Sequence, residues 1–329
     1  MLYELLSGIK TLSVIGMCKN AGKTTVLNSL IAECENAGER LGLTSIGRDG
    51  ERSDLVTNTQ KPEIFIRSGA IVATAEQLLR EGDISMEVLE TTGIPTPMGE
   101  IVIVLARSAG YVQLGGASIT DHQQTVRDRL FELGADRVMI DGAISRKSLG
   151  NPALADGVIL SSGASYDPDI RKTVEDTAYY ARLFSLPAFE GEAPDLGRYT
   201  CVTENGAYGA DRLGDLAKQL KEGVRSLVIR GAFTDATARE LTDYAKLLSG
   251  VTLAAQDASR LLLKRENHAR LARFAGEIRL LNSTRLVAVT VNPFSAYGMH
   301  YDKNEFKERV EAKLIECGVS APVTDVKDV

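Results

Sequence analysis

The segment from residue 11 to residue 38 most constrains the fold, because a short β-rich run, a glycine-containing loop and an amphipathic helix follow one another there. The run at 11–16 is TLSVIG. The helical pattern after it places its apolar side chains on one face and reaches a stop signal at Gly38. These side chains are Val26, Leu27, Leu30, Ile31 and Cys34.

Strand-like runs continue to alternate with helical patterns along the chain. Several of the runs are apolar on both faces, as buried parallel strands are. This alternation predicts an α/β fold with a mostly parallel sheet flanked by helices. The further runs lie at 41–47, 70–75, 100–106, 136–143 and 156–164.

The length of 329 residues suits two domains. Residues 186–209 are rich in Gly, Pro and acidic residues and have no clear period, which is typical of a connection. We therefore expect a first domain at 1–190, a linker at 191–212, and a smaller, Rossmann-like α/β domain at 213–329. Strands of the second domain are expected at 226–232, 251–258 and 285–293.

Composition argues against several classes of protein. The net charge of −6, from 38 basic and 44 acidic residues, disfavours a basic groove for nucleic acid. The apolar runs are too short to span a membrane, and the first ten residues lack the features of a signal peptide. The four cysteines lie far apart. We therefore expect reduced thiols and no zinc site in a cytoplasmic protein.

The loop after the first strand predicts a phosphate site. Gly16 and Gly22 are separated by five residues, where the usual phosphate-binding loop has four. Backbone N–H groups at the start of the following helix can cradle phosphate oxygens, and Lys23 would reach the β and γ phosphates. The alternative is a glycine-rich turn with an incidental Lys-Thr. The expected nucleotide-binding residues here are Gly16, Asn20, Ala21, Gly22, Lys23, Thr24 and Thr25.

A magnesium ion is expected beside this loop. Thr24 would be one ligand, and Asp141, which follows the apolar run of 136–140, would be the second. Asp49, after the second predicted strand, would hold a metal-bound water or sense the γ-phosphate, with Glu51 and Asp54 nearby. Helix caps, turns and solvated loops are the alternative roles for these acids.

Basic residues near the loop could offset charge during phosphoryl transfer. Lys19 and Arg146 are the candidates beside Lys23 and Asp49, although basic side chains often only face solvent. Arg107 and Ser108 follow another predicted strand and either line a second ligand site or turn the chain. The absence of an Asn-Lys-x-Asp motif favours ATP over GTP.

The second half of the chain offers three further candidates at predicted strand ends. Asp235, Asp257 and Asn292 would form a second ligand site, because ligands of open α/β sheets bind at carboxyl strand ends. Asn292 could instead read adenine, since its amide both donates and accepts hydrogen bonds. The alternative is that all three are turn formers.

A resemblance accounts for the unusual spacing of the loop. GMCKNAGKTT (16–25) resembles the long phosphate loop of the dethiobiotin synthetase and cobyric acid synthase branch of P-loop NTPases, and IDGA (140–143) is similar to the Glu-Gly-Ala strand end of that branch. Two departures are present. YTCVT around Cys201 lacks the nucleophile turn of a glutamine amidotransferase, so the resemblance does not extend to cobyric acid synthase chemistry. Ile144 and Ser145 replace the glycines that usually continue the EGAGG pattern, next to the substrate pocket of the ligases.

A longer succession of segments between Gly42 and Gly298 resembles the reactivase subunits of lysine 5,6-aminomutases from amino-acid-fermenting bacteria. The resemblance implies a helper that uses ATP and Mg²⁺ to release damaged cobalamin from an adenosylcobalamin-dependent aminomutase. It also implies a partner ATPase subunit related to mismatch-repair proteins, and it leaves a homodimer open. The segments are GLTSIGRDGE, GEIVIVLARSAG, MIDGAISRKS, VILSSGAS, VIRGAFTD and VTVNPFSAYG.

Three functions follow from these patterns. The first is an ATP-hydrolysing reactivase. The second is an ATP-dependent ligase of the dethiobiotin synthetase type, which forms an acyl-phosphate and uses Lys19 or Arg107 to neutralise a carboxylate substrate. The third is a nucleotide-dependent regulatory switch with little turnover.

Overall fold

The structure is a computed structural model that describes residues 2–46, 63–143, 151–219 and 223–327. The chain divides into two compact units. The first combines Met1–Ala181 with Arg285–Val329, and the second is Arg182–Thr284.

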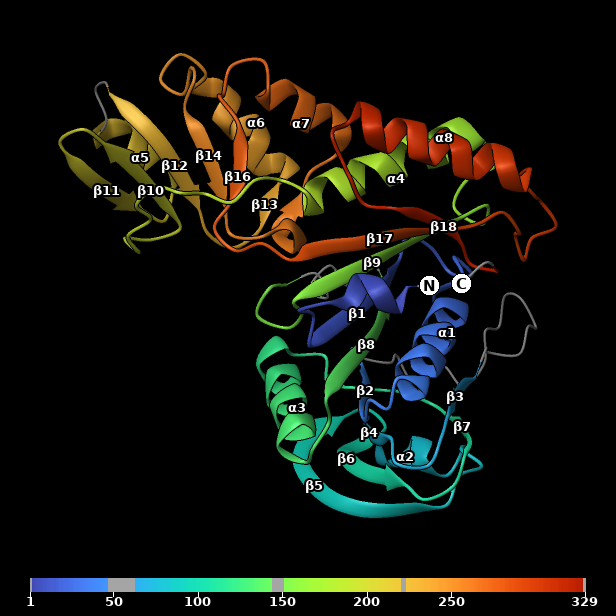
Figure 1. Cartoon of the computed structure of the whole chain (residues 1–329). Coiled ribbons are helices and arrows are strands. Elements are labelled where there is room, and N and C mark those ends of the chain that lie inside the picture. Colours follow the sequence, from blue (N-terminus) through green and yellow to red (C-terminus); the bar gives the residue numbers. More distant parts are fainter. Residues whose placement is uncertain (1, 47–62, 144–150, 220–222, 328–329) are drawn as a thin grey trace. The chain divides into compact units, whose positions relative to one another are not determined.

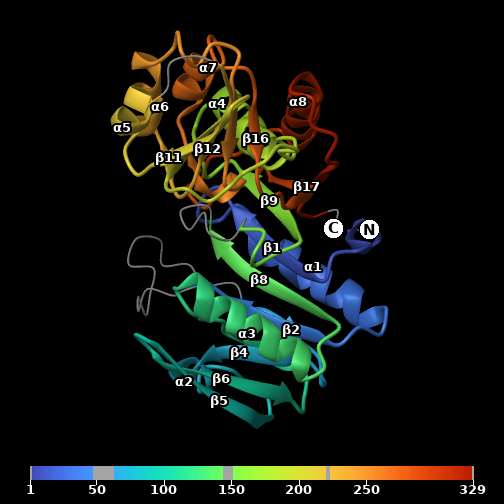
Figure 2. The ribbon, with the colours of Figure 1, turned by 90° about the vertical axis from the view of Figure 1, so that its left-hand side faces the viewer.

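The first unit contains a nine-stranded, mostly parallel sheet, as the alternation of strands and helices predicted (Figure 1). Every neighbouring pair from β18 to β4 is parallel, and the last two pairings, β4 with β6 and β6 with β5, are antiparallel. Figure 2 lets the order be followed from β9 to β5. In sheet order the strands are β18 (Val323–Asp325), β17 (Arg285–Asn292), β9 (Gly157–Gly163), β1 (Thr11–Gly16), β8 (Arg137–Ala143), β2 (Leu41–Ser45), β4 (Ile71–Ala75), β6 (Gly99–Ala106) and β5 (Met86–Thr96).

Helices cover both faces of this sheet, which is why its central strands are buried along their whole length. Figure 1 shows α1 (Lys23–Asn36) and α3 (Thr120–Glu132) on opposite sides of β8 and β2. The buried side chains of α1 are the five that the sequence predicted, Val26, Leu27, Leu30, Ile31 and Cys34. On β2, a Cβ added at Gly42 would meet Leu130 and Ala135, so α3 packs closely there.

The remaining elements of the first unit extend this arrangement. Thr177 of α4 (Ile170–Phe184) shares a 2.6 Å hydrogen bond with Ser162 of β9, and α8 (Lys303–Glu316) packs on β17 and β18. The smaller elements are η1 (Tyr3–Leu6), β3 (Ile64–Ile66), which pairs with β7 (Gly110–Val112), and α2 (Glu76–Leu79).

The second unit is built on a mixed five-stranded sheet. Its first two pairings are antiparallel and its last two are parallel. The strands are β11 (Gly206–Ala210), β10 (Tyr199–Thr203), β12 (Val224–Ile229), β14 (Thr252–Ala255) and β16 (Ile278–Leu280). The other elements are α5 (Leu213–Gln219), β13 (Phe233–Thr234), α6 (Asp235–Asp243), η3 (Ala258–Arg260), β15 (Leu261–Leu262) and α7 (Arg265–Leu271). None of the helices in the described ranges combines the length and apolar character that a membrane span requires.

This division differs from the domain boundaries expected from the sequence. The stretch expected as a linker, 191–212, contains the hairpin of β10 and β11. The strand expected in the second domain at 285–293 is β17, which pairs with β9 in the sheet of the first unit. A strand that is apolar on both faces fits the interior of either sheet, and its pairing depends on contacts that are remote in sequence.

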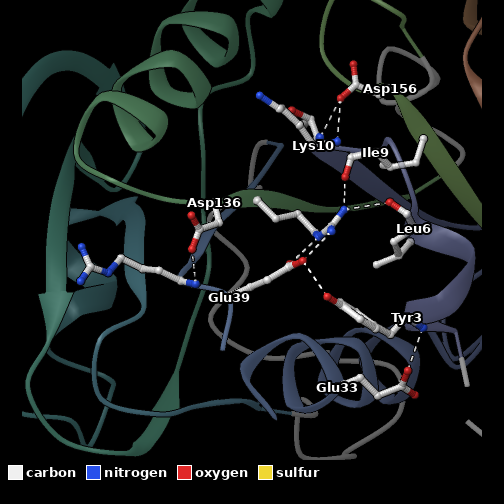
Figure 3. A network of polar contacts seen from close by, with 11 residues as sticks. Tyr3, Leu6, Ile9, Lys10, Glu33, Glu39, Asp136 and Asp156 are labelled. Carbon is white, nitrogen blue, oxygen red and sulfur yellow. Dashed lines mark hydrogen bonds and ion pairs between the residues drawn. The ribbon is translucent and has the colours of Figure 1, made fainter. Parts of the chain in front are cut away.

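A polar network ties the N-terminal segment to the amino ends of the parallel strands (Figure 3). Arg137 of β8 binds Glu39 through two hydrogen bonds of 2.7 and 2.8 Å, and it also donates to the carbonyls of Leu6 and Ile9. The Tyr3 hydroxyl donates to the same Glu39 carboxylate at 3.1 Å. Both partners of the ion pair are largely buried, with 11% and 18% of their side chains exposed. Removing one partner therefore leaves an uncompensated charge.

Arg137→Ala is expected to lower the free energy of unfolding by about 3 kcal/mol, because the Glu39 carboxylate and two carbonyls lose their donor. Urea unfolding of the full chain measures this change. Arg171→Ala is the matched control, because its ion pair with Asp169 lies at the surface and its loss should leave the midpoint unchanged. Equal midpoints for Arg137→Ala and wild type would contradict the role given to the network.

The same ion pair predicts a pH dependence. Hydrogen bonds from Arg137 hold the pKa of the Glu39 carboxyl below its usual 4.5. In acid, Glu39 therefore binds a proton more readily in the unfolded chain than in the folded protein. The ion pair contributes its full stability above the pKa that Glu39 has in the unfolded chain, and this contribution is lost as pH falls through the lower pKa of the folded protein. We expect the stability difference between wild type and Glu39→Gln to shrink between about pH 6 and about pH 3. Unfolding at several pH values measures it, and a constant difference would refute the assignment.

Candidate functional site

The candidate site is the loop that joins β1 to α1. Strand β1 lies between β8 and β9, and the Met17 N–H donates to the Ser161 carbonyl at 2.8 Å, one residue beyond the strand. Gly22 precedes α1 with φ of +90°, and no side chain caps the helix. The first turn of α1 contains no acidic residue. Since the first N–H groups of a helix have no partner within it, this end of α1 suits an anion.

The Lys23 side chain lies across Gly16. A Cβ added at Gly16 would stand 2.6 Å from Lys23 Cδ, so any other residue at this position would require the Lys23 side chain to shift. Lys23 Nζ ends 3.4 Å from Asp141 Oδ1, and the two side chains are 19% and 24% exposed. The structure thus places an ammonium and a carboxylate side by side at the carboxyl ends of β1 and β8, where both remain accessible.

Asp141 reaches this position through the register of three strands. Val14 of β1 and Ser45 of β2 stand on either side of it, and its carbonyl accepts a hydrogen bond from the Ile46 N–H at 3.1 Å. Thr24 follows Lys23 and is half-buried, whereas Thr25 is exposed.

The donor types around the loop fit a magnesium nucleotide. No group of three His, Cys, Asp or Glu side chains placed to hold a metal occurs in the described part of the chain. A threonine hydroxyl and one carboxylate, completed by phosphate oxygens and water, nevertheless form a donor set that Mg²⁺ takes in nucleotide sites. The uncapped helix end, Lys23 and the glycine at 16 fit a phosphate chain in the same way.

The loop between β1 and α1 also contacts residues at the ends of β17 and β18. Asn20 has φ of +61°, and its carbonyl accepts a 2.9 Å hydrogen bond from Asn292 Nδ2 at the end of β17. A Cβ added at Gly22 would lie 2.6 Å from Val326 Cγ1, just after β18. Asn292, expected in the second domain, thus belongs to the first unit and contacts the phosphate-loop candidate.

The remaining loop residues differ in exposure. Lys19 and Asn20 are exposed, and Ala21 is buried. Burial raises the pKa of the Cys18 thiol to about 11, which keeps it protonated at neutral pH. All four cysteines are free.

Other expected site residues are either not described by the structure or lie away from the loop. Asp49, Glu51, Asp54 and Arg146 fall outside the described residues. Arg107 follows β6, which is antiparallel to β4. Arg107 therefore lies at the amino ends of the parallel strands, whereas the loop after β1 lies at their carboxyl ends. It binds the Glu87 carboxylate there with an Nε–O distance of 2.8 Å. The topology therefore separates Arg107 from Lys23.

The two acids expected at strand ends in the second half of the chain, Asp235 and Asp257, are engaged in hydrogen bonds within the second unit. Asp235 accepts hydrogen bonds from the Lys264 N–H at 2.8 Å and from Asn267 Nδ2 at 2.7 Å. Asp257 is buried, caps η3 through the Arg260 N–H, and also accepts from the Ser259 hydroxyl. Asp257 thus caps a helical turn, and Asp235 joins the start of α6 to the start of α7.

The sequence analysis missed three residues that support the loop, namely Ser161, Thr290 and Val326. Ser161 of β9 stands beside Gly16 and accepts a 2.8 Å hydrogen bond from the Thr290 hydroxyl of β17, with both side chains fully buried. Val326 packs against Gly22. The small polar end of the 156–164 run was the available signal for Ser161, whereas Val326 carries none.

Neither a scan against protein-family models nor a search of curated proteins returned a match to this chain.

Gly22→Ala is expected to destabilise the first unit by about 2–3 kcal/mol, because the left-handed backbone disfavours a side chain and the new methyl group meets Val326. Adding Val326→Ala should recover the steric part and leave the backbone part. Urea unfolding of the two single variants and the double variant measures this coupling.

Gly38→Ala is the matched control, because Gly38 has φ of +85° and a Cβ added there would have no atom within 4 Å outside its chain neighbours and its own helix. It should lose only the backbone part, about 1 kcal/mol. Strict additivity of Gly22→Ala and Val326→Ala would contradict the contact.

Proposed function

We propose that the chain is a magnesium-dependent P-loop ATPase. The observation that carries this proposal is the position of Lys23, which begins an uncapped helix after a glycine-bounded loop and ends 3.4 Å from a carboxylate of the neighbouring strand. A lysine over helix N–H groups binds phosphate oxygens, and a nearby carboxylate serves the cation that accompanies them.

Each side chain has a defined task in this proposal. Lys23 leaves Asp141 to neutralise the β and γ phosphates, and Asp141 is then available to the cation together with Thr24. When bound, Mg²⁺ would neutralise charge that develops on the phosphate oxygens. The N–H groups of residues 20–25 would hold the phosphates. Lys19, Asp49 and Arg146 are proposed to supply further charge and to place the attacking water.

We further propose that ATP turnover serves the reactivation of an adenosylcobalamin-dependent aminomutase, together with a second ATPase subunit related to mismatch-repair proteins. The ordered resemblance of segments between residues 42 and 298 supports this role. The lack of an Asn-Lys-x-Asp motif supports ATP as the nucleotide.

Lys23→Ala is expected to lower ATP turnover by about 10²- to 10³-fold, because it removes a positive charge from the transferred phosphate. Asp141→Asn should weaken the dependence on Mg²⁺. Lys10→Ala, an exposed lysine just before β1, is the control and should leave turnover unchanged. Calorimetric binding of ATP with Mg²⁺, followed by phosphate release, provides both readouts.

The biological role is tested by adding a cobalamin-inactivated aminomutase, with and without the partner ATPase. Stimulated phosphate release would support the reactivase. Stimulation by a small carboxylic acid alone would point to a ligase, and tight ATP binding without turnover to a switch. No binding of ATP with Mg²⁺ by the wild-type chain would overturn the proposal.

A further inference from the structure

We infer that Asn292 is a positioning residue that holds the phosphate-binding loop in its active shape, and that it does not read the nucleotide base. The inference rests on the proposed function. It follows from the direction of the Asn292 amide, from the backbone of Asn20, and from the fit of the loop against β9 and β17.

The Asn292 amide has both of its ends engaged within the protein. Its Oδ1 accepts the Phe294 N–H at 3.1 Å, which turns Nδ2 toward the loop. Nδ2 then donates to the Asn20 carbonyl at 2.9 Å. A base reader presents its donor and its acceptor together to the ligand. Asn292 uses one of each to join β17 to the loop.

This hydrogen bond fixes the orientation of a peptide group that contributes to the anion site. The bond between Asn20 and Ala21 is trans, so its N–H points away from its carbonyl. When Asn292 holds the carbonyl, the Ala21 N–H is directed away from β17. Release of the carbonyl would let this peptide rotate, and a carbonyl oxygen turned toward phosphate repels it.

The loop packs closely against β9 at Ala21. Ala21 is 1% exposed, and a Cβ added at Gly163 would lie 3.3 Å from the Ala21 Cα. The same Cβ would lie 3.1 Å from the Asn292 carbonyl oxygen. Gly163 thus lets β9 approach both the loop and β17. Asn20 itself holds the left-handed conformation, which asparagine tolerates better than most residues.

The experiment compares a ligand that has a base with one that has none. ATP and inorganic tripolyphosphate, each with Mg²⁺, are titrated into the full-length wild type, Asn292→Ser and Asn292→Ala by calorimetry. Serine keeps an oxygen for the Phe294 N–H but is too short to reach the loop. We expect both variants to bind both ligands about tenfold more weakly, because the hydrogen bond that orients the loop is lost.

Ala296→Ser, a change at an exposed position that follows the same strand, is the matched control and should bind as wild type does. Thermal unfolding without ligand verifies that each variant is folded, and Asn292→Ser replaces Asn292→Ala if the latter is not. A loss confined to ATP, with tripolyphosphate unchanged, would overturn the inference in favour of a base reader. Unchanged binding of both ligands would overturn it outright, as would an equal loss in Ala296→Ser. Failure of wild type to bind either ligand would instead refute the proposed function.

Discussion

The parallel pairing of β1 with β8 is the constraint on which the candidate site depends. Val14 stands opposite Asp141, and both side chains lie on the face of the sheet that α1 covers. Side chains alternate between faces, so a slip of one residue would turn Asp141 toward α3 and away from Lys23. The buried side chains of β1 and β8 on both faces oppose such a slip. Packing of the core thus sets the separation of an ammonium and a carboxylate that are remote in sequence.

The ion pairs at the two ends of the parallel strands differ in length and in exposure. At the amino ends, Arg137 and Glu39 join β8 to the N-terminal segment through short, largely buried hydrogen bonds. At the carboxyl ends, the ion pair of Lys23 and Asp141 is longer and more exposed. A partner that is held loosely can be exchanged for a ligand, whereas one that is held tightly contributes to the fold. This contrast supports the placement of the proposed nucleotide site at the carboxyl ends.

The sequence predicted those parts of the fold that local pattern determines. The bounds of β1 and the buried face of α1 follow from short-range periodicity. Lys23 at the start of the helix and Asp141 near the end of a strand could each be singled out locally, whereas their contact depends on the pairing of β1 with β8. The hairpin of β10 and β11 was missed because its exposed, glycine-rich strand lacks an apolar run. The sheet to which β17 belongs could not be predicted, because its apolar residues suit either core. The contact of Asn292 with Asn20 depends on that pairing, so the site could be predicted only in part.

The interruption of the first unit by Arg182–Thr284 has a consequence for biosynthesis. Strand β17 is made only after the whole second unit, yet it forms the neighbour of β9. Until β17 has been synthesised, the nascent chain exposes the unpaired edge of β9, and an unpaired strand edge can associate incorrectly with other chains. The peptide that carries the Asn20 carbonyl gains its anchor at the same late moment. The proposed phosphate site would therefore gain its Asn292 anchor only after the whole second unit has been synthesised.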